Sequence, residues 1–92
     1  MAGMPRISSF YGIVIWMYHD ELPHPGRPHF HATYAEHEAS IEIETLAVLA
    51  GGLPKRALRL VLEWAALHRE ELLRNWELAR TAQSLEQVDP LP

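Results

Sequence analysis

The sequence has 92 residues, of which 48% are hydrophobic and 22% are charged, a balance that predicts one globular domain and not a disordered chain. It contains no cysteine, which excludes a disulfide framework, a thiol nucleophile and any cysteine-ligated zinc or iron–sulfur site. The net charge of −4 argues against a protein that binds nucleic acid mainly by attraction to phosphates. Its apolar runs are too short to cross a bilayer and its first residues lack the pattern of a secretory leader, so we expect a cytoplasmic protein without a membrane partner.

The first half of the chain has the composition of a β-sheet. Residues 10–18 are aromatic and β-branched on both alternating faces, which is typical of a strand buried on both sides. Residues 19–28 hold three prolines and a glycine and predict a loop. Residues 29–35 and 38–44 alternate between apolar and polar side chains, so we expect two paired strands with a tight reversal at Glu36 and His37. Residues 48–50 would add a short edge strand.

After Pro54 the hydrophobic period becomes that of a helix. At 100° per residue, residues 55–80 place their apolar side chains, including Trp64 and Trp76, on one arc and their charged side chains on the other. No proline or glycine interrupts this pattern, so we expect one long helix, with any bend at His68, in preference to two helices. The predicted fold is therefore α+β: a three- to four-stranded antiparallel meander with one long C-terminal helix on one face. Residues 83–92 predict an extended tail, which would protect a flank of the helix if it docks.

Four of the six histidines lie between residues 19 and 31, beside the acidic strand 38–44. In a hairpin without a bulge, the numbers of facing residues would sum to 73, which places Thr33 opposite Ser40. The same register places His31 opposite Glu42 and His29 opposite Glu44. Side chains that face each other in this way lie about 4.5–5.5 Å apart at Cβ. We therefore expect two imidazoles and two carboxylates in one patch on the side of the sheet away from the helix.

Three interpretations of this patch remain open. It is a solvated face of cross-strand pairs, a divalent metal site, or a site of general acid–base catalysis in which a carboxylate orients an imidazole. Two histidines one residue apart on a strand point the same way, and a carboxylate with a loop histidine would complete a site for zinc, manganese or nickel. The candidate metal ligands are His29, His31, Glu42, Glu44, His24 and His19.

Two further groups of residues suggest binding surfaces. A basic cluster at the start of the predicted helix, where free backbone N–H groups favour anions, is either a solvated face or a contact for an anion or an acidic partner. It consists of Lys55, Arg56 and Arg59. Four large side chains widen the apolar surface beyond what a small core covers, and we expect them to form an interface. They are Trp16, Leu60, Leu67 and Leu78.

Three segments, residues 4–18, 28–34 and 53–79, together resemble a bacterial family of unknown function, the domain-of-unknown-function family numbered 4160. The resemblance runs from Met4 to Pro92 and implies that residues 4–92 are the domain and residues 1–3 an extension. It also implies a small bacterial protein encoded beside another small domain, as in toxin–antitoxin pairs, and it brings no catalytic mechanism. The family pattern carries over to Pro28, His29, His31, Tyr34, Trp64, His68, Glu71, Leu72 and Trp76.

These observations lead to three functional hypotheses, in this order. The first is an interaction module that self-associates or pairs with a small cognate protein through the apolar surface. The second is a metal-dependent hydrolase or nuclease-like toxin that uses the histidine and glutamate patch. The third is an RNA-binding module that uses the basic cluster. The sequence leaves open whether the protein is an enzyme.

Overall fold

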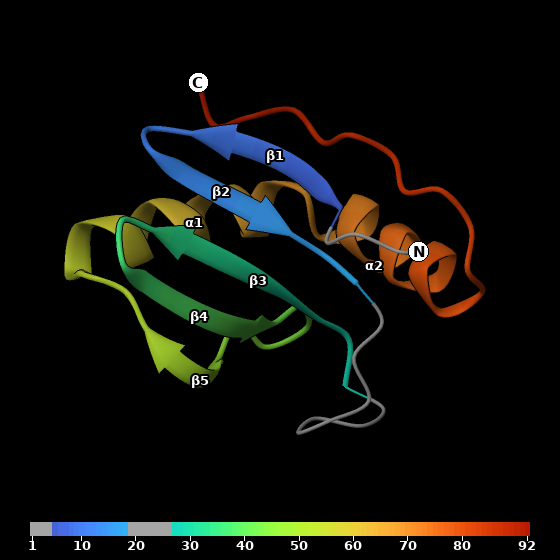
Figure 1. The fold of residues 1–92 in the computed structure, drawn as a ribbon, viewed down its shortest axis with the longest axis horizontal. Helices are drawn as coiled ribbons and strands as arrows, with labels where there is room; N and C mark the ends of the chain where they lie inside the picture. The colour runs from blue at the N-terminus through green and yellow to red at the C-terminus, as the bar shows by residue number, and fades with distance from the viewer. Residues whose placement is uncertain (1–4, 19–26) are drawn as a thin grey trace.

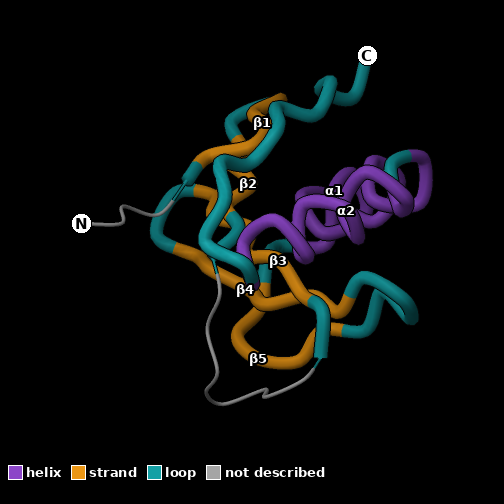
Figure 2. Tube along the Cα trace, turned by 90° about the vertical axis from the view of Figure 1, so that its right-hand side faces the viewer, coloured by secondary structure: helices purple, strands orange, loops and turns teal. Residues whose placement is uncertain are grey.

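The computed structural model describes residues 5–18 and 27–92, which form a five-stranded antiparallel sheet and two helices (Figure 1). The strands pair in chain order, and both helices lie on one side of the sheet (Figure 2). The α+β class and the antiparallel meander agree with the sequence analysis, whereas three or four strands and one helix were too few. The elements are β1 (Arg6–Phe10), β2 (Ile13–Trp16), β3 (His29–Tyr34), β4 (His37–Glu42), β5 (Val48–Gly52), α1 (Lys55–Leu67) and α2 (Arg69–Arg80).

The additional strand is β1, which lies mostly before the segment 10–18 that was expected to be one strand, and a turn within that segment separates β1 from β2. Phe10 pairs with Ile13, and the two residues between them, Tyr11 and Gly12, have φ angles of 52° and 81°. Positive φ at both central positions defines the two-residue turn that matches the twist of a hairpin. Such turns are usually marked by Asn-Gly or Asp-Gly, and a tyrosine at the first position hid this one in an aromatic run.

The second hairpin, β3–β4, is paired two residues away from the predicted register. His29 faces Glu42 and His31 faces Ser40. The pairing expected from a sum of 73, with His31 opposite Glu42 and His29 opposite Glu44, is therefore wrong. The reversal is a two-residue turn in which Ala35 takes a φ of 53°. Alanine at a positive φ is uncommon, so nothing in the sequence marked the centre of this turn.

The predicted long helix is two helices separated by one residue, His68. Its φ of −119° and ψ of 27° depart from helical values, and its N–H is shared between the carbonyl oxygens of Trp64 and Ala65, both at 3.2 Å. The His68 side chain binds Glu71, three residues into α2, and its ring lies 5.6 Å from that of Trp64. Contacts of the His68 side chain therefore stabilise the interruption between the two helices, which explains why no glycine or proline is found there.

The core lies between the sheet and α1. Trp64 of α1 is fully buried, and its ring lies 5.4 Å from that of Phe10 and 5.8 Å from that of Phe30. The sheet contributes Ile7, Ile13, Ile15 and Ile41, and Met17 and Ile43 directly follow β2 and β4; all six have no exposed surface. α2, which lies near the end of the sheet where β3 begins (Figure 1), continues the apolar arc with the buried residues Leu72 and Trp76.

The C-terminal segment, residues 83–92, docks as an extended strap along β1 (Figure 1, red). The side chain of Asn75, which is 1% exposed, donates to the carbonyl oxygen of Glu86 and accepts from the N–H of Glu86, both at 2.8 Å. Val88 is buried, and its N–H donates to the carbonyl oxygen of Ile7 at 2.8 Å. The tail therefore covers the edge strand β1 and belongs to the folded structure.

Removal of the Asn75 amide should weaken the docking of the tail. We expect Asn75→Ala to lower the free energy of unfolding by about 2–3 kcal/mol, because it deletes two buried hydrogen bonds and leaves backbone groups of Glu86 without them. The neighbouring variant Arg74→Ala removes only an exposed ion pair with Glu86 and should cost less than about 0.5 kcal/mol. Urea unfolding followed by circular dichroism measures the free energy of unfolding of each variant. Equal values for Asn75→Ala and Arg74→Ala would show that the tail is not held by Asn75.

The strand at the other edge, β5, contains a glycine whose side-chain position is blocked. Gly51 has a φ of 72°, and a Cβ there would overlap the carbonyl oxygen of Glu38, whereas a Cβ on Gly52 meets nothing within 4 Å. We expect Gly51→Ala to destabilise the fold by about 2 kcal/mol or more, because the strain of a positive φ adds to the overlap between the new Cβ and the carbonyl oxygen of Glu38. Gly52→Ala is the matched control and should stay within about 0.5 kcal/mol of the parent. Thermal unfolding distinguishes the two, and a neutral Gly51→Ala would contradict this backbone conformation.

Candidate functional site

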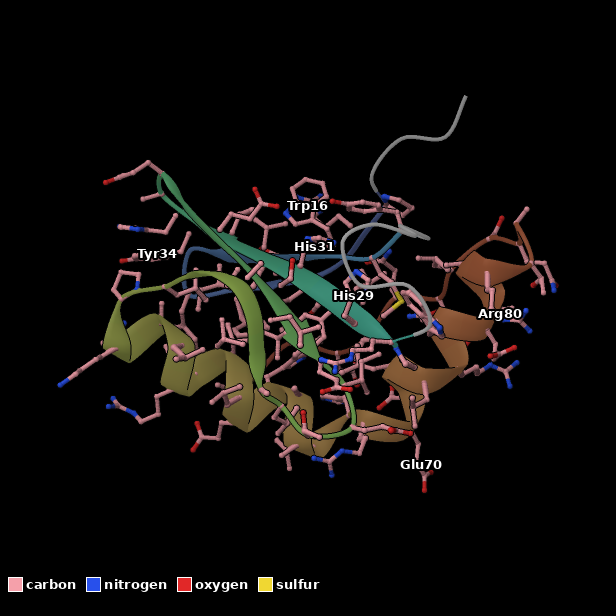
Figure 3. The ribbon with its side chains drawn as sticks, turned by 90° about the horizontal axis from the view of Figure 1, so that it is seen from below. Trp16, His29, His31, Tyr34, Glu70 and Arg80 are labelled. Atoms are coloured by element: carbon pink, nitrogen blue, oxygen red, sulfur yellow. The ribbon has the colours of Figure 1, made fainter. Side chains whose placement is uncertain are left out.

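The two histidines of β3 are buried, and the interpretation of them as a solvated face is therefore wrong. His29 has no exposed surface and His31 is 6% exposed. The His29 ring lies 5.0 Å from that of Trp76 on α2, and the His31 ring stacks on Tyr18 at 4.5 Å. Figure 3 shows His29 at the end of β3 that lies toward α2, with His31 and Trp16 farther along the sheet. α2 thus covers one member of a pair that the sequence analysis placed away from the helix.

Hydrogen bonds orient both imidazoles. His29 Nδ1–H donates to the carbonyl oxygen of Arg27 at 2.7 Å. His31 Nδ1 lies 3.2 Å from Ser40 Oγ and 3.5 Å from Glu38 Oε2. The carboxylate beside His31 is therefore that of Glu38, which the sequence analysis did not select because its register placed Glu42 there.

Of the two predicted glutamate ligands, Glu42 faces His29 across the ladder and Glu44 does not pair with β3. Glu42 Oε1 accepts a hydrogen bond from the Thr45 hydroxyl at 2.7 Å, and Glu44 is exposed beyond the end of β4. In the part of the chain that the structure describes, no three histidine, aspartate or glutamate side chains are arranged to hold a metal ion. The other two predicted ligands, His19 and His24, lie outside the described residues.

The basic cluster lies at the start of α1. Lys55, Arg56 and Arg59 are all exposed, and the first turn of the helix contains no acidic residue. None of the three forms an ion pair with another described residue. Their use by an anion, an acidic partner or RNA stays a prediction.

An apolar hollow of about 650 Å³, here called the α1 groove, lies between α1, the β1–β2 turn and the C-terminal tail. It brings together two of the four predicted interface residues, Leu60 and Leu67. Leu67 is 66% exposed, and Tyr11, on the opposite wall, is 53% exposed. Its lining includes Tyr11, Arg56, Leu60, Glu63, Leu67 and Leu91.

The other two predicted interface residues lie elsewhere. Trp16 is half-buried on the sheet, opposite His31, and its indole N–H donates to Thr33 Oγ1 at 2.9 Å. Leu78 is half-buried on α2 and does not line the α1 groove. Sequence reasoning missed Tyr11 and Leu91 as groove residues, since only the turn and the docked tail place them beside α1.

A family described as a domain of unknown function, DUF4160, matches residues 12–77. The chain belongs to this family. No curated protein and no solved structure matches the chain. The matched residues of this DUF4160 domain contain the histidine pair and the α1 wall of the groove, whereas Tyr11 and Leu91 lie outside them. Neither helix among the described residues has the length and apolar character needed to span a membrane.

Proposed function

We propose that this protein is a protein-interaction module whose binding face is the α1 groove. The observation that carries the proposal is the exposure of Leu67 and Tyr11 in one apolar hollow. Complete burial of a leucine side chain contributes about 1.5–3 kcal/mol, so a partner that fills this hollow gains affinity from surface the isolated chain leaves in water. Large side chains exposed together in a concavity are typical of interaction sites.

The walls of the groove are held in place before any partner arrives. The Tyr11 hydroxyl donates to the backbone oxygen of Pro92 at 2.7 Å, and the Trp64 indole N–H donates to the carbonyl oxygen of Asp89 at 2.8 Å. Asn75 anchors the same segment farther back, at Glu86. A groove that is already ordered loses little conformational entropy on binding, which favours its use as a docking site.

The partner classes that suit this groove are a second copy of the chain and a small cognate protein, as in the toxin–antitoxin arrangement that the family resemblance implies. Arg56 and Glu63 line the groove beside Leu60 and Leu67, so charged and apolar side chains meet in it. Protein–protein interfaces likewise combine apolar contact area with charged and polar side chains. Both partner classes use the same surface, so one set of variants tests them.

A polar substitution at Leu67 should weaken association without harm to the fold. We expect Leu67→Ser to raise the dissociation constant by about tenfold or more, because Leu67 contributes exposed apolar surface to the lining of the groove. Val48→Ser, at another exposed hydrophobic residue outside the groove, is the matched control and should leave association unchanged.

The measurement is sedimentation velocity and native mass spectrometry, on the protein alone and on the protein co-expressed with the product of its neighbouring gene. A strict monomer that captures no partner in either experiment would refute the interaction module.

We also propose a second function, in which His29 and His31 supply two ligands to a divalent metal ion. It is supported by the hydrogen bond from His29 Nδ1–H to a backbone carbonyl oxygen, the contact that commonly orients a histidine whose Nε2 binds a metal. A catalytic site would need a third protein ligand, and a metal-dependent hydrolase or nuclease-like activity depends on it.

Titration calorimetry with zinc, manganese and nickel tests the metal proposal. We expect one site with micromolar or tighter affinity, lost in His31→Ala and retained in His37→Ala, because His37 is exposed in the β3–β4 turn region. The absence of binding for all three metals at micromolar concentration would exclude this function and leave the interaction module untouched.

A further inference from the structure

We infer that the occupant of the α1 groove is a second copy of this chain, with the two α1 helices packed antiparallel across a twofold axis near Leu60. This inference rests on the proposed interaction function and specifies its partner. The choice of a second copy as the partner follows from the pattern of charge along α1.

Four residues of α1 form one stripe along the groove: Arg56, Leu60, Glu63 and Leu67. Their spacing of four, three and four residues is that of the seam along which two helices pack side by side. Leucines alternate in this stripe with residues of opposite charge. The stripe therefore offers apolar contact and two charges to a facing helix.

The two charged residues of the stripe have no partner within the described chain. Both Arg56 and Glu63 are exposed, and neither makes an ion pair or a side-chain hydrogen bond with another described residue. Three other arginines, Arg69, Arg74 and Arg80, do make such contacts. The groove thus leaves one positive and one negative charge available to a partner.

The order of these charges selects the partner and its direction. Arg56 and Glu63 lie seven residues apart, which is about 10.5 Å along the helix axis and about 20° around it. An antiparallel second copy places each Arg56 beside the Glu63 of the other copy, and twofold symmetry makes both pairs at once. A parallel copy would set Arg56 against Arg56 and Glu63 against Glu63. A uniformly acidic or basic partner would match only one of the two charges.

Charge reversal provides a test that an intramolecular role cannot mimic. Arg56→Glu alone and Glu63→Arg alone should each weaken self-association by about tenfold, since each homodimer then holds two like-charge contacts. An equimolar mixture of the two variants should restore a 1:1 heterodimer, because both Arg–Glu pairs are re-formed between the copies. Lys55→Glu makes the same charge change one residue away, outside the groove lining, and should leave the dimer intact.

Native mass spectrometry distinguishes the two variants in the mixture by mass, and circular dichroism checks that each is folded. Leu60→Cys adds an independent probe in a chain that has no cysteine, and mild oxidation should cross-link it to a second copy through this residue. Failure of the mixture to form heterodimer, or of Leu60→Cys to cross-link, would overturn the antiparallel pairing.

The outcome also separates this inference from the function on which it rests. If the wild-type chain is monomeric but binds the product of its neighbouring gene in a Leu67-dependent way, the groove is an interaction site and the second copy is wrong. If Leu67→Ser changes neither kind of association, the proposed function itself fails.

Discussion

The fold is organised around the burial of one side chain, the indole of Trp64. Its ring fills the space between α1 and the sheet against Phe10 and Phe30, while its N–H needs a hydrogen-bond acceptor because it is removed from water. The carbonyl oxygen of Asp89 provides that acceptor and thereby attaches the C-terminal tail to the core. The helix, the sheet and the tail therefore meet at one residue, and the α1 groove exists because the tail is held there.

The two candidate sites differ in what the structure offers to a ligand. The histidine pair lies among aromatic rings, and its hydrogen bonds, from His29 Nδ1–H to the carbonyl oxygen of Arg27 and between His31 Nδ1 and Ser40 Oγ, are contacts that also stabilise buried polar groups. The α1 groove instead leaves Leu67 and Tyr11 in water, which a folded chain of this size tolerates at a cost unless a partner covers them. This difference is the reason that association is proposed ahead of metal-dependent chemistry.

The shift of two residues in the β3–β4 hairpin shows how a local detail decides a functional hypothesis. A shift of two preserves the face on which each side chain lies, so His29, His31 and Glu42 still share one face of the sheet, although the ring of Trp76 on α2 lies beside His29 there. The shift nevertheless changes the cross-strand neighbour of each residue. His31 faces Ser40 instead of Glu42, and the carboxylate beside its ring is that of Glu38. The composition of the face was therefore predictable, and its pairwise geometry was not.

The sequence by itself determined the α+β class, the strands β3, β4 and β5, the residues that face the core, the family, and Leu60 and Leu67 as surface leucines, because these follow from hydrophobic periodicity and from motifs. Tertiary structure alone decided the β1–β2 turn, the hairpin register and the full interruption of the helix at His68, where the sequence had placed any bend, since Tyr11, Ala35 and His68 adopt backbone angles that their residue types do not predict. It also decided the groove, whose Leu91 wall depends on Asn75 and Trp64 binding backbone groups 11 and 25 residues away. Contacts of that range arise only once the chain has folded, so no local pattern encodes them.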